Sequence, residues 1–217
     1  MKVDLHVHTI HSSDGYCTVA EAVKFAKAKG LDGIAIADHN TIAGHREAKK
    51  LSGKGFIIIP AAEISSSSGH IVALGIKELV PRGLSTAETV KRIKEQGGVA
   101  IAAHPFIIGR NPSLMYKAKF DAMEVLNGRA VFPANRLARG FAEKHGIPGV
   151  GGSDAHRGDE IGLAYTEIDC EKNIASILSG IRKGGPSASG RTLPLPSLLW
   201  RFLQRFLHHH SRRRRER

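Results

Sequence analysis

Histidine and carboxylate residues recur at the ends of apolar runs through the body of the chain. His6 and His8 open the series and are separated by one residue, so on a β-strand both side chains would project from the same face. Asp154 and His156 close the series with the same spacing. Between the two pairs, Asp38, His39, Glu63, His70 and His104 lie at further such positions. Because divalent metals favour imidazole and carboxylate ligands, the pattern predicts a multinuclear hydrolytic metal centre.

The nucleophile of such a centre is expected to be water rather than a side chain. The sequence contains no Gly-x-Ser-x-Gly motif, and neither Cys17 nor Cys170 lies in a recognised active-site motif. A bound divalent ion can lower the pKa of water from ~15.7 to ~7, which supplies hydroxide at neutral pH. Two ions ~3.5–4 Å apart can also stabilise the attacking and leaving oxygens. The predicted chemistry is therefore hydrolysis by attack of metal-bound hydroxide.

Composition and charge set further expectations. The chain has 217 residues, two cysteines and a formal net charge of +12, and seven Arg fall within residues 201–217. A basic chain favours polyanions, so we expect a small phosphorylated substrate or nucleotide, with nucleic acid as a partner of the basic tail. The few cysteines, the absence of a signal-peptide pattern and the lack of a long apolar run predict a cytoplasmic protein that does not bind membranes.

Short strand-like runs alternate with helical segments. The expected strands cover residues 3–7, 33–37, 56–62, 70–76, 99–103, 122–126, 147–151 and 163–168. The expected helices cover residues 18–29, 41–51, 85–96, 133–144 and 173–182. This alternation favours a parallel sheet, either open or closed into a barrel. Five candidate ligands fall at the C-terminal ends of different expected strands: His8, His39, Glu63, His104 and Asp154. Since α/β barrels gather their reactive groups at that end, the barrel is favoured.

The C-terminal part of the chain has a different composition. Residues 185–197 are rich in Gly, Ser and Pro, which predicts a linker. Residues 198–217 begin with leucines and phenylalanines at helical spacing and end in an arginine run. This pattern predicts a basic amphipathic helix and an Arg-rich tail. We therefore expect a catalytic domain over residues 1–184, followed by an appendage that supplies no metal ligand.

Taken together, these residues resemble the motifs of the PHP (polymerase and histidinol phosphatase) family of metal-dependent phosphoesterases. The resemblance covers roughly residues 1–184, and its motifs occur in the order typical of the family. They are Asp4-Leu5-His6-Val7-His8-Thr9, Ser13-Asp14-Gly15, Ala37-Asp38-His39-Asn40-Thr41, Ala61-Ala62-Glu63, Gly69-His70-Ile71, Ala103-His104-Pro105 and Gly152-Ser153-Asp154-Ala155-His156. The resemblance implies an α/β fold, namely a distorted (β/α)7 TIM-like barrel with a site for up to three metals.

The resemblance also implies how the ligands are shared among the metals. The first metal would be held by His6, His8, Glu63 and Asp154. Glu63 would bridge to a second metal, held also by His70 and His104. A third metal would be held by Asp14, His39 and His156. The expected cofactors are thus two to three divalent ions, and this ligand set suits Mn, Fe or Zn.

Catalytic and substrate-binding roles can be assigned to individual residues. We assign catalytic roles to Glu63, Asp154, His39 and Asp38. Asp38, together with Asp4, is expected to orient ligand histidines, as metal-bound imidazoles require. Three arginines follow expected site strands and could contact phosphate: Arg110, Arg129 and Arg157. For Arg129, a solvated loop position is an equal alternative.

Three functions are compatible with these residues. The first is a hydrolase acting on phosphate ester bonds, which removes phosphate from a phosphomonoester of a small metabolite or nucleotide. The second is an exonuclease on short RNA or DNA, since the same metals cleave diesters and the tail is basic. The third is a non-catalytic nucleic-acid-binding protein that uses the barrel as a scaffold. The complete set of ligand-type residues favours the enzymes, while the sequence does not give the oligomeric state.

Overall fold

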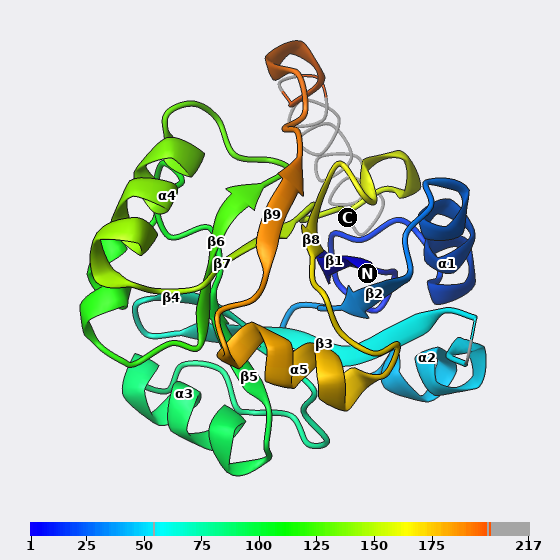
Figure 1. Ribbon diagram of the computed structural model, residues 1–217, viewed down its shortest axis with the longest axis horizontal. Helices are drawn as coiled ribbons and strands as arrows, with labels where there is room; N and C mark the ends of the chain where they lie inside the picture. Colours follow the sequence, from blue (N-terminus) through cyan, green and yellow to red (C-terminus); the bar gives the residue numbers. More distant parts are fainter. Residues whose placement is uncertain (54, 199, 201–217) are drawn as a thin grey trace, which may run out of the picture.

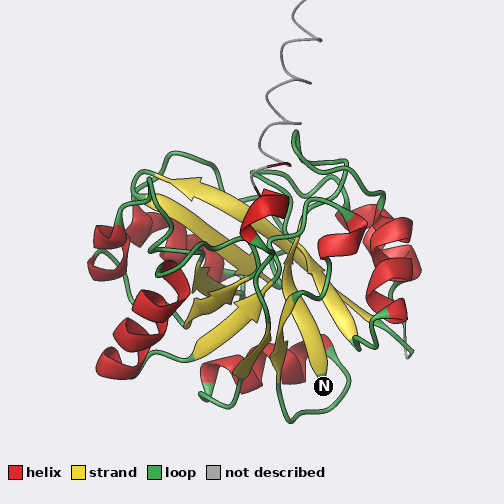
Figure 2. Ribbon diagram, turned by 90° about the horizontal axis from the view of Figure 1, so that it is seen from above, coloured by secondary structure: helices red, strands yellow, loops and turns green. Residues whose placement is uncertain are grey.

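The computed structural model describes residues 1–53, 55–198 and 200. Within this part of the chain, a nine-stranded sheet curls into a nearly closed barrel with helices around the outside (Figure 1). Figure 2 shows the strands gathered in the middle of the molecule and the helices on its flanks. The strands are β1 (Lys2–Val7), β2 (Gly33–Ile36), β3 (Ile57–Ser66), β4 (Gly69–Leu74), β5 (Val99–Ala102), β6 (Ala122–Asn127), β7 (Gly149–Gly152), β8 (Ala164–Glu167) and β9 (Ser187–Gly190).

The strands are not all parallel, which corrects the expectation of a parallel sheet. The pairs β1–β2, β2–β3, β5–β6 and β6–β7 are parallel, whereas β3–β4, β4–β5, β1–β8 and β8–β9 are antiparallel. β4 reverses direction because only Ser67 and Ser68 separate it from β3, and a parallel pair needs a crossover of about a dozen residues or more. The start of β4 therefore lies at the same end of the barrel as the C-terminal ends of β3 and β5, its antiparallel neighbours.

The barrel closes where β1 meets the residues that follow β7. Val7 and Ala155 form a parallel bridge. The backbone N–H of His8 donates to the carbonyl oxygen of Ala155 at 2.8 Å, and the N–H of Ala155 donates to the carbonyl oxygen of His6 at 3.2 Å. β8 pairs with the beginning of β1, at Lys2 and Val3. On this side of β1, the first part of the strand therefore contacts β8 and the last part contacts the residues after β7. The predicted distorted α/β barrel is confirmed, and this seam is one place where it departs from a regular barrel.

The helices pack outside the sheet, except for α5, which contacts the barrel interior. They are α1 (Val19–Ala28), α2 (His45–Leu51), α3 (Thr86–Glu95), α4 (Ala134–His145) and α5 (Ile174–Arg182). α1 begins with the predicted capping box: the Thr18 hydroxyl accepts from the N–H of Glu21 at 3.2 Å, and the Glu21 carboxylate accepts from the N–H of Thr18 at 2.8 Å. α2 begins later than residue 41, because the Thr41 hydroxyl accepts from the N–H of Ala43 and forms a turn first.

The hydrophobic core has an inner cluster and two outer clusters. Inside the barrel, Leu5, Ile59 and Ile101 are almost completely buried. Ile177 and Ile181 of α5 join the same cluster, so α5 covers one end of the barrel and leaves the other end to the polar residues. Of the outer clusters, one lies between the strands and α1, and the other lies between the strands and α3 and α4. The ligand-bearing strands are thus packed on both faces, which restricts their movement.

The chain past residue 184 continues the sheet, which corrects the predicted linker over residues 185–197. Ser187–Gly190 form β9, which pairs with β8, and the N–H of the buried Leu193 donates to the carbonyl oxygen of Gly128 at 2.7 Å. Backbone hydrogen bonds hold this polar segment in the sheet, so its side-chain composition could not reveal that it forms a strand. Apart from residues 198 and 200, the predicted basic helix and tail lie outside the described residues. No helix in the described ranges is long and apolar enough to span a bilayer.

Candidate metal centre

The candidate ligands converge at one end of the barrel. Several directly follow the C-terminal ends of parallel strands, which is the predicted position. His70 lies near the start of β4 instead, and the antiparallel direction of this strand brings it to the same end. Glu63 lies inside β3 rather than after it. The residues that the structure brings together are His6, His8, Asp14, His39, Glu63, His70, His104, Asp154 and His156.

Glu63 lies at the centre of this cluster. Its Oε1 is 2.6 Å from Nδ1 of His70 and 2.9 Å from Nε2 of His104. Its Oε2 is 2.9 Å from Nδ1 of His39 and 3.5 Å from Nε2 of His8. The two carboxylate oxygens therefore face different imidazoles, which is the arrangement that a bridging carboxylate needs.

Two further carboxylates extend the cluster on either side of the histidines. Asp14 Oδ2 lies 3.2 Å from Nε2 of His156 and 3.5 Å from Nε2 of His39. Asp154 Oδ1 lies 3.4 Å from Nε2 of His8 and 3.9 Å from Nε2 of His6. These contacts group the residues in the way that the family resemblance implies for a first and a third metal.

The donor atoms fit a set of divalent cations. Nε2 of His6, Nε2 of His8 and Oε2 of Glu63 are buried and have no hydrogen-bond partner among the described residues. Leaving buried polar atoms without partners is costly, and bound cations would satisfy them. Four sets of ligand atoms each lie within 4.8 Å of one another: His8, Asp14, His39 and His156; His6, His8 and Asp154; His6, His104 and Glu124; and His39, Glu63 and His70.

The pKa values favour the metal-binding protonation state at Glu63 and His8, whereas that of His39 favours the protonated imidazole, which would have to lose a proton to bind a metal. Burial would raise the pKa of Glu63, but the surrounding imidazoles hold it well below its ordinary value. Burial and the nearby His156 lower the pKa of His8 to about 3. Burial opposes protonation of His39, yet Asp14 and Glu63 outweigh it and raise the pKa of His39 to about 10. Glu63 as a carboxylate and His8 as a neutral imidazole are the forms in which these groups bind divalent ions.

Two ligands and a neighbour sit on backbone in the left-handed region. The φ angles are 33° at His104, 54° at Asp154 and 51° at Asn40. Residues other than glycine adopt this region at a cost of about 1–3 kcal/mol each, and they cluster at functional sites. The N–H of His104 donates to Oε2 of Glu124 at 2.9 Å, which holds this turn.

The candidate ligands differ in how far their side chains are exposed. The His39 and His70 side chains are 24% and 15% exposed, whereas those of His8 and Glu63 are 0% and 1% exposed. Arg110 lies beside His70, with its Nη1 3.2 Å from Nε2 of that histidine. A substrate would therefore meet His39, His70 and Arg110 first.

The other two predicted phosphate-binding arginines have protein partners. Nη1 of Arg129 lies 3.2 Å from Oε2 of the fully buried Glu160, and that carboxylate also accepts from the N–H of His156 at 2.7 Å. Arg129 thus supports the turn that carries His156, which is neither of the roles expected from the sequence. The Arg157 guanidinium lies over the ring of Tyr16, 4.5 Å from its centroid.

The predicted orienting aspartates bind backbone N–H groups and, for Asp38, a hydroxyl, rather than imidazole. Asp38 accepts from the N–H of Thr9 at 2.6 Å and from its hydroxyl at 2.7 Å. Asp4 accepts from the N–H of Ser153 at 2.9 Å and from that of Gly162 at 2.8 Å. These contacts differ from the expected contact with ligand histidines, because short aspartates on neighbouring strands reach the loop backbone first. Both residues still hold the loops from which ligands project.

Sequence reasoning missed Glu124, the residue that orients two of the ligands. Its Oε1 lies 2.7 Å from Nδ1 of His6, and its Oε2 accepts from the N–H of His104 and, at 3.1 Å, from Nδ2 of Asn127. Nδ2 of Asn127 also lies 3.3 Å from Oδ2 of Asp154. The signal available in the sequence was a single carboxylate flanked by the apolar Met123 and Val125 in β6, because a carboxylate is costly to bury without partners.

Two family models match the chain. Residues 4–109 match the PHP domain, and residues 132–186 match the PHP-associated domain. An uncharacterised protein of Methanocaldococcus jannaschii is 41% identical over 140 residues, which cover 58% of this chain and 82% of that protein. A 5'-3' exoribonuclease of Haemophilus influenzae is 34% identical over 105 residues, which cover 46% of this chain and 38% of that enzyme.

Solved structures share the fold. A two-domain protein from Bacteroides vulgatus, which contains a predicted PHP-like metal-dependent phosphoesterase, matches with a TM-score of 0.69 and 20% identity over 94% of this chain and 69% of that one. Endonuclease Q, bound to a 27-mer duplex with an abasic lesion at the active site, matches with a TM-score of 0.68 and 19% identity over 88% of this chain and 60% of that one. Since the matched families span both the early and the late ligands of the barrel, we conclude that this chain belongs to the PHP family of metal-dependent phosphoesterases, hydrolases that act on phosphate esters.

Proposed function

We propose that this protein removes phosphate from a phosphomonoester of a small metabolite or nucleotide. The observation that carries the proposal is the depth of the cluster: His8 and Glu63 are buried, and His39 and His70 are its most exposed ligands. A terminal phosphoryl group can enter such a site, whereas a diester within a long chain must pass a strand of substrate on both sides. Arg110, beside His70, supplies a positive charge and a fork of donors for the phosphoryl oxygens.

Different residues of this chain are assigned to holding the metals and to binding the substrate. We assign the holding of divalent ions to the nine converging ligands, and the unpartnered buried atoms of His6, His8 and Glu63 fit such ions. When bound, divalent ions lower the pKa of water and neutralise charge on the phosphoryl group. Glu63 and Asp154 supply anionic oxygens, His39 lies at the entrance, and Asp38 holds the loop after β1. Arg110 binds and orients the phosphoryl oxygens.

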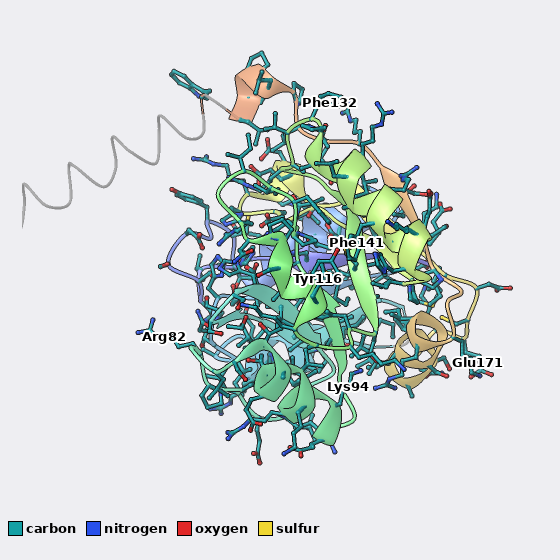
Figure 3. All side chains as sticks on the ribbon, turned by 90° about the vertical axis from the view of Figure 1, so that its left-hand side faces the viewer. Arg82, Lys94, Tyr116, Phe132, Phe141 and Glu171 are labelled. Carbon is teal, nitrogen blue, oxygen red and sulfur yellow. The ribbon has the colours of Figure 1, made fainter. Side chains whose placement is uncertain are left out.

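The test of this proposal compares a monoester with a diester. Mn²⁺-loaded protein should hydrolyse p-nitrophenyl phosphate faster than bis-p-nitrophenyl phosphate. Arg110→Ala should raise KM for the monoester about 10-fold or more, because a hydrogen bond to a charged group is worth about 1.5–3 kcal/mol. Arg82→Ala is the matched control, since Arg82 is exposed and extends away from the body of the molecule (Figure 3). A faster diester reaction, or an Arg110→Ala variant with unchanged KM, would count against the proposal.

A second candidate is exonucleolytic cleavage of short RNA or DNA. Two similarities favour it: one relative of this chain is a 5'-3' exoribonuclease, and a protein of the same fold is an endonuclease bound to DNA. The net charge of +12 suits a polyanionic substrate. Incubation with a 5'-labelled and a 3'-labelled oligonucleotide would separate the candidates. Stepwise shortening identifies an exonuclease, while release of phosphate with the chain intact identifies a monoesterase.

A further inference from the structure

Tyr16 and Arg157 form a flat, charged pair beside two of the ligands. The guanidinium carbon of Arg157 lies 4.5 Å from the centroid of the Tyr16 ring. Tyr16 follows Asp14 by two residues, and its N–H donates to the carbonyl oxygen of His156 at 2.9 Å. Arg157 is the residue after His156. The pair is therefore tied through the backbone to Asp14 and His156, which the metal centre uses.

The Tyr16 ring is held in place, yet much of it faces solvent. Tyr16 is 47% exposed, although Arg157 lies over one face of its ring. The loop that carries it is closed by the N–H of Ile10, which donates to the carbonyl oxygen of Cys17 at 2.8 Å. A ring fixed in this way loses little conformational freedom when a second flat group stacks on it. Tyr16 is thus prepared for a planar partner.

We propose that Tyr16 and Arg157 form a stacking platform for the nucleobase next to the phosphate that the metal centre hydrolyses. This inference rests on the proposed function and narrows its substrate to a nucleotide, either free or at the end of an oligonucleotide. Every base has a π-face, so stacking on tyrosine accepts different bases. A guanidinium beside the platform adds cation–π attraction. An alkyl or sugar phosphate offers no such face.

Arg110 and the proposed platform lie beside different ligands of the metal centre. Arg110 contacts His70, whereas the platform adjoins Asp14 and His156. The rings of His70 and His156 both neighbour that of His39, with centroids 5.4 Å and 6.3 Å away. A phosphoryl group at the partly open His39 can therefore meet Arg110 while the rest of the substrate extends toward Tyr16. Phosphate and base are thus recognised by different residues of one entrance.

The test measures how activity depends on the presence of a base. Full-length Mn²⁺-loaded protein is given a nucleoside 5'-monophosphate, a 5'-phosphorylated hexanucleotide and glycerol phosphate. Tyr16→Ala should lower the ratio of kcat/KM for the nucleotide to that for glycerol phosphate about 10-fold, which corresponds to about 1.4 kcal/mol. Tyr16→Phe should keep the ratio. Tyr116→Ala is the control, because Tyr116 is also exposed but its ring packs against Phe141 of α4 (Figure 3).

The three substrates distinguish the sources of the base. A fall in the ratio for the mononucleotide alone identifies a free nucleotide, and a fall for the hexanucleotide alone identifies a chain end. Calorimetric binding of the nucleoside monophosphate gives a second readout, in which Tyr16→Ala should bind about 10-fold more weakly than wild type. An unchanged ratio with unchanged binding overturns the platform, as does an equal loss for all three substrates. If the wild type hydrolyses none of them, the proposed function fails, while the binding measurement still decides the role of Tyr16.

Discussion

Replacing Glu124 by glutamine tests how the ligands are held. The wild-type carboxylate faces three donors: Nδ1 of His6 at 2.7 Å, the N–H of His104 at 2.9 Å and Nδ2 of Asn127 at 3.1 Å. A carboxylate accepts at both oxygens, whereas an amide accepts at one and donates at the other. In Glu124→Gln, the NH₂ group of the new amide must therefore face either Nδ1 of His6 or the N–H of His104, and both of these donate to the wild-type carboxylate.

Either orientation of the new amide has a cost. If its NH₂ faces His104, a buried donor loses its acceptor, which costs about 1–3 kcal/mol of stability. If its NH₂ faces His6, Nδ1 becomes the acceptor and the proton moves to Nε2, the atom that lies 3.5 Å from Glu63. A protonated Nε2 cannot bind a metal. Outer contacts of this kind typically change metal affinity about 10- to 100-fold, or about 1.4–2.7 kcal/mol.

Calorimetric titration of metal-free protein with Mn²⁺ and Zn²⁺ measures the affinity, and urea unfolding of the same samples measures the stability. Glu88→Gln is the matched control, because Glu88 is partly exposed, pairs with Arg92 on the surface of α3 at 2.7 Å and is not one of the candidate ligands. The control should leave metal affinity within twofold of wild type. If Glu124→Gln also retains wild-type affinity and wild-type stability, the reasoning about His6 is refuted.

Three other outcomes are expected. Glu63→Gln should lower activity more than about 100-fold, equivalent to about 2.7 kcal/mol, and reduce the metal content by elemental analysis while the circular dichroism spectrum is retained; near-normal turnover would show that Glu63 does not bridge. Burial lowers the pKa of His45, whose Nε2–H donates to the carbonyl oxygen of Ala61 at 2.8 Å, so stability is lost as pH falls below the ordinary value of 6.5. In urea unfolding of metal-free protein, His45→Gln should lose less stability between pH 7.5 and 5.5 than wild type does, and an equal loss would contradict this. Residues 201–217 contain seven Arg and one Glu. Their removal should preserve p-nitrophenyl phosphate hydrolysis and weaken oligonucleotide binding most at low salt. Oligonucleotide binding that is unchanged at 50 mM salt would show that the tail does not contribute to it.

The repeated motifs allowed most of the candidate cluster to be predicted. His6 and His8 share a face because strand geometry alternates, and His39 and His104 each follow a short apolar strand. Such features depend only on local sequence. The nearly closed barrel also followed, because the ligand-type residues had to converge.

The remaining features depend on contacts between distant segments. Glu124 reads as a lone acidic residue between apolar neighbours until His6 and His104 are placed beside it. β9 is polar and is held by its backbone pairing with β8, so no hydrophobic pattern marks it. Arg129 is basic and follows a strand, but Glu160, its partner, comes from a turn much later in the chain. In each case the deciding interaction is tertiary.

The seam between β1 and the residues after β7 has a consequence for the order of folding. Val7 and Ala155 bridge segments that are synthesised early and late. A nascent chain that ends before Asp154 has His6, His8 and Glu63 but lacks Asp154, which is one of the four residues predicted to hold the first metal. Contacts of such long sequence separation form slowly, because the intervening chain must be ordered first. High-affinity metal binding should therefore coincide with closure of the barrel. The rate of metal binding during refolding would then report the rate of the last folding step.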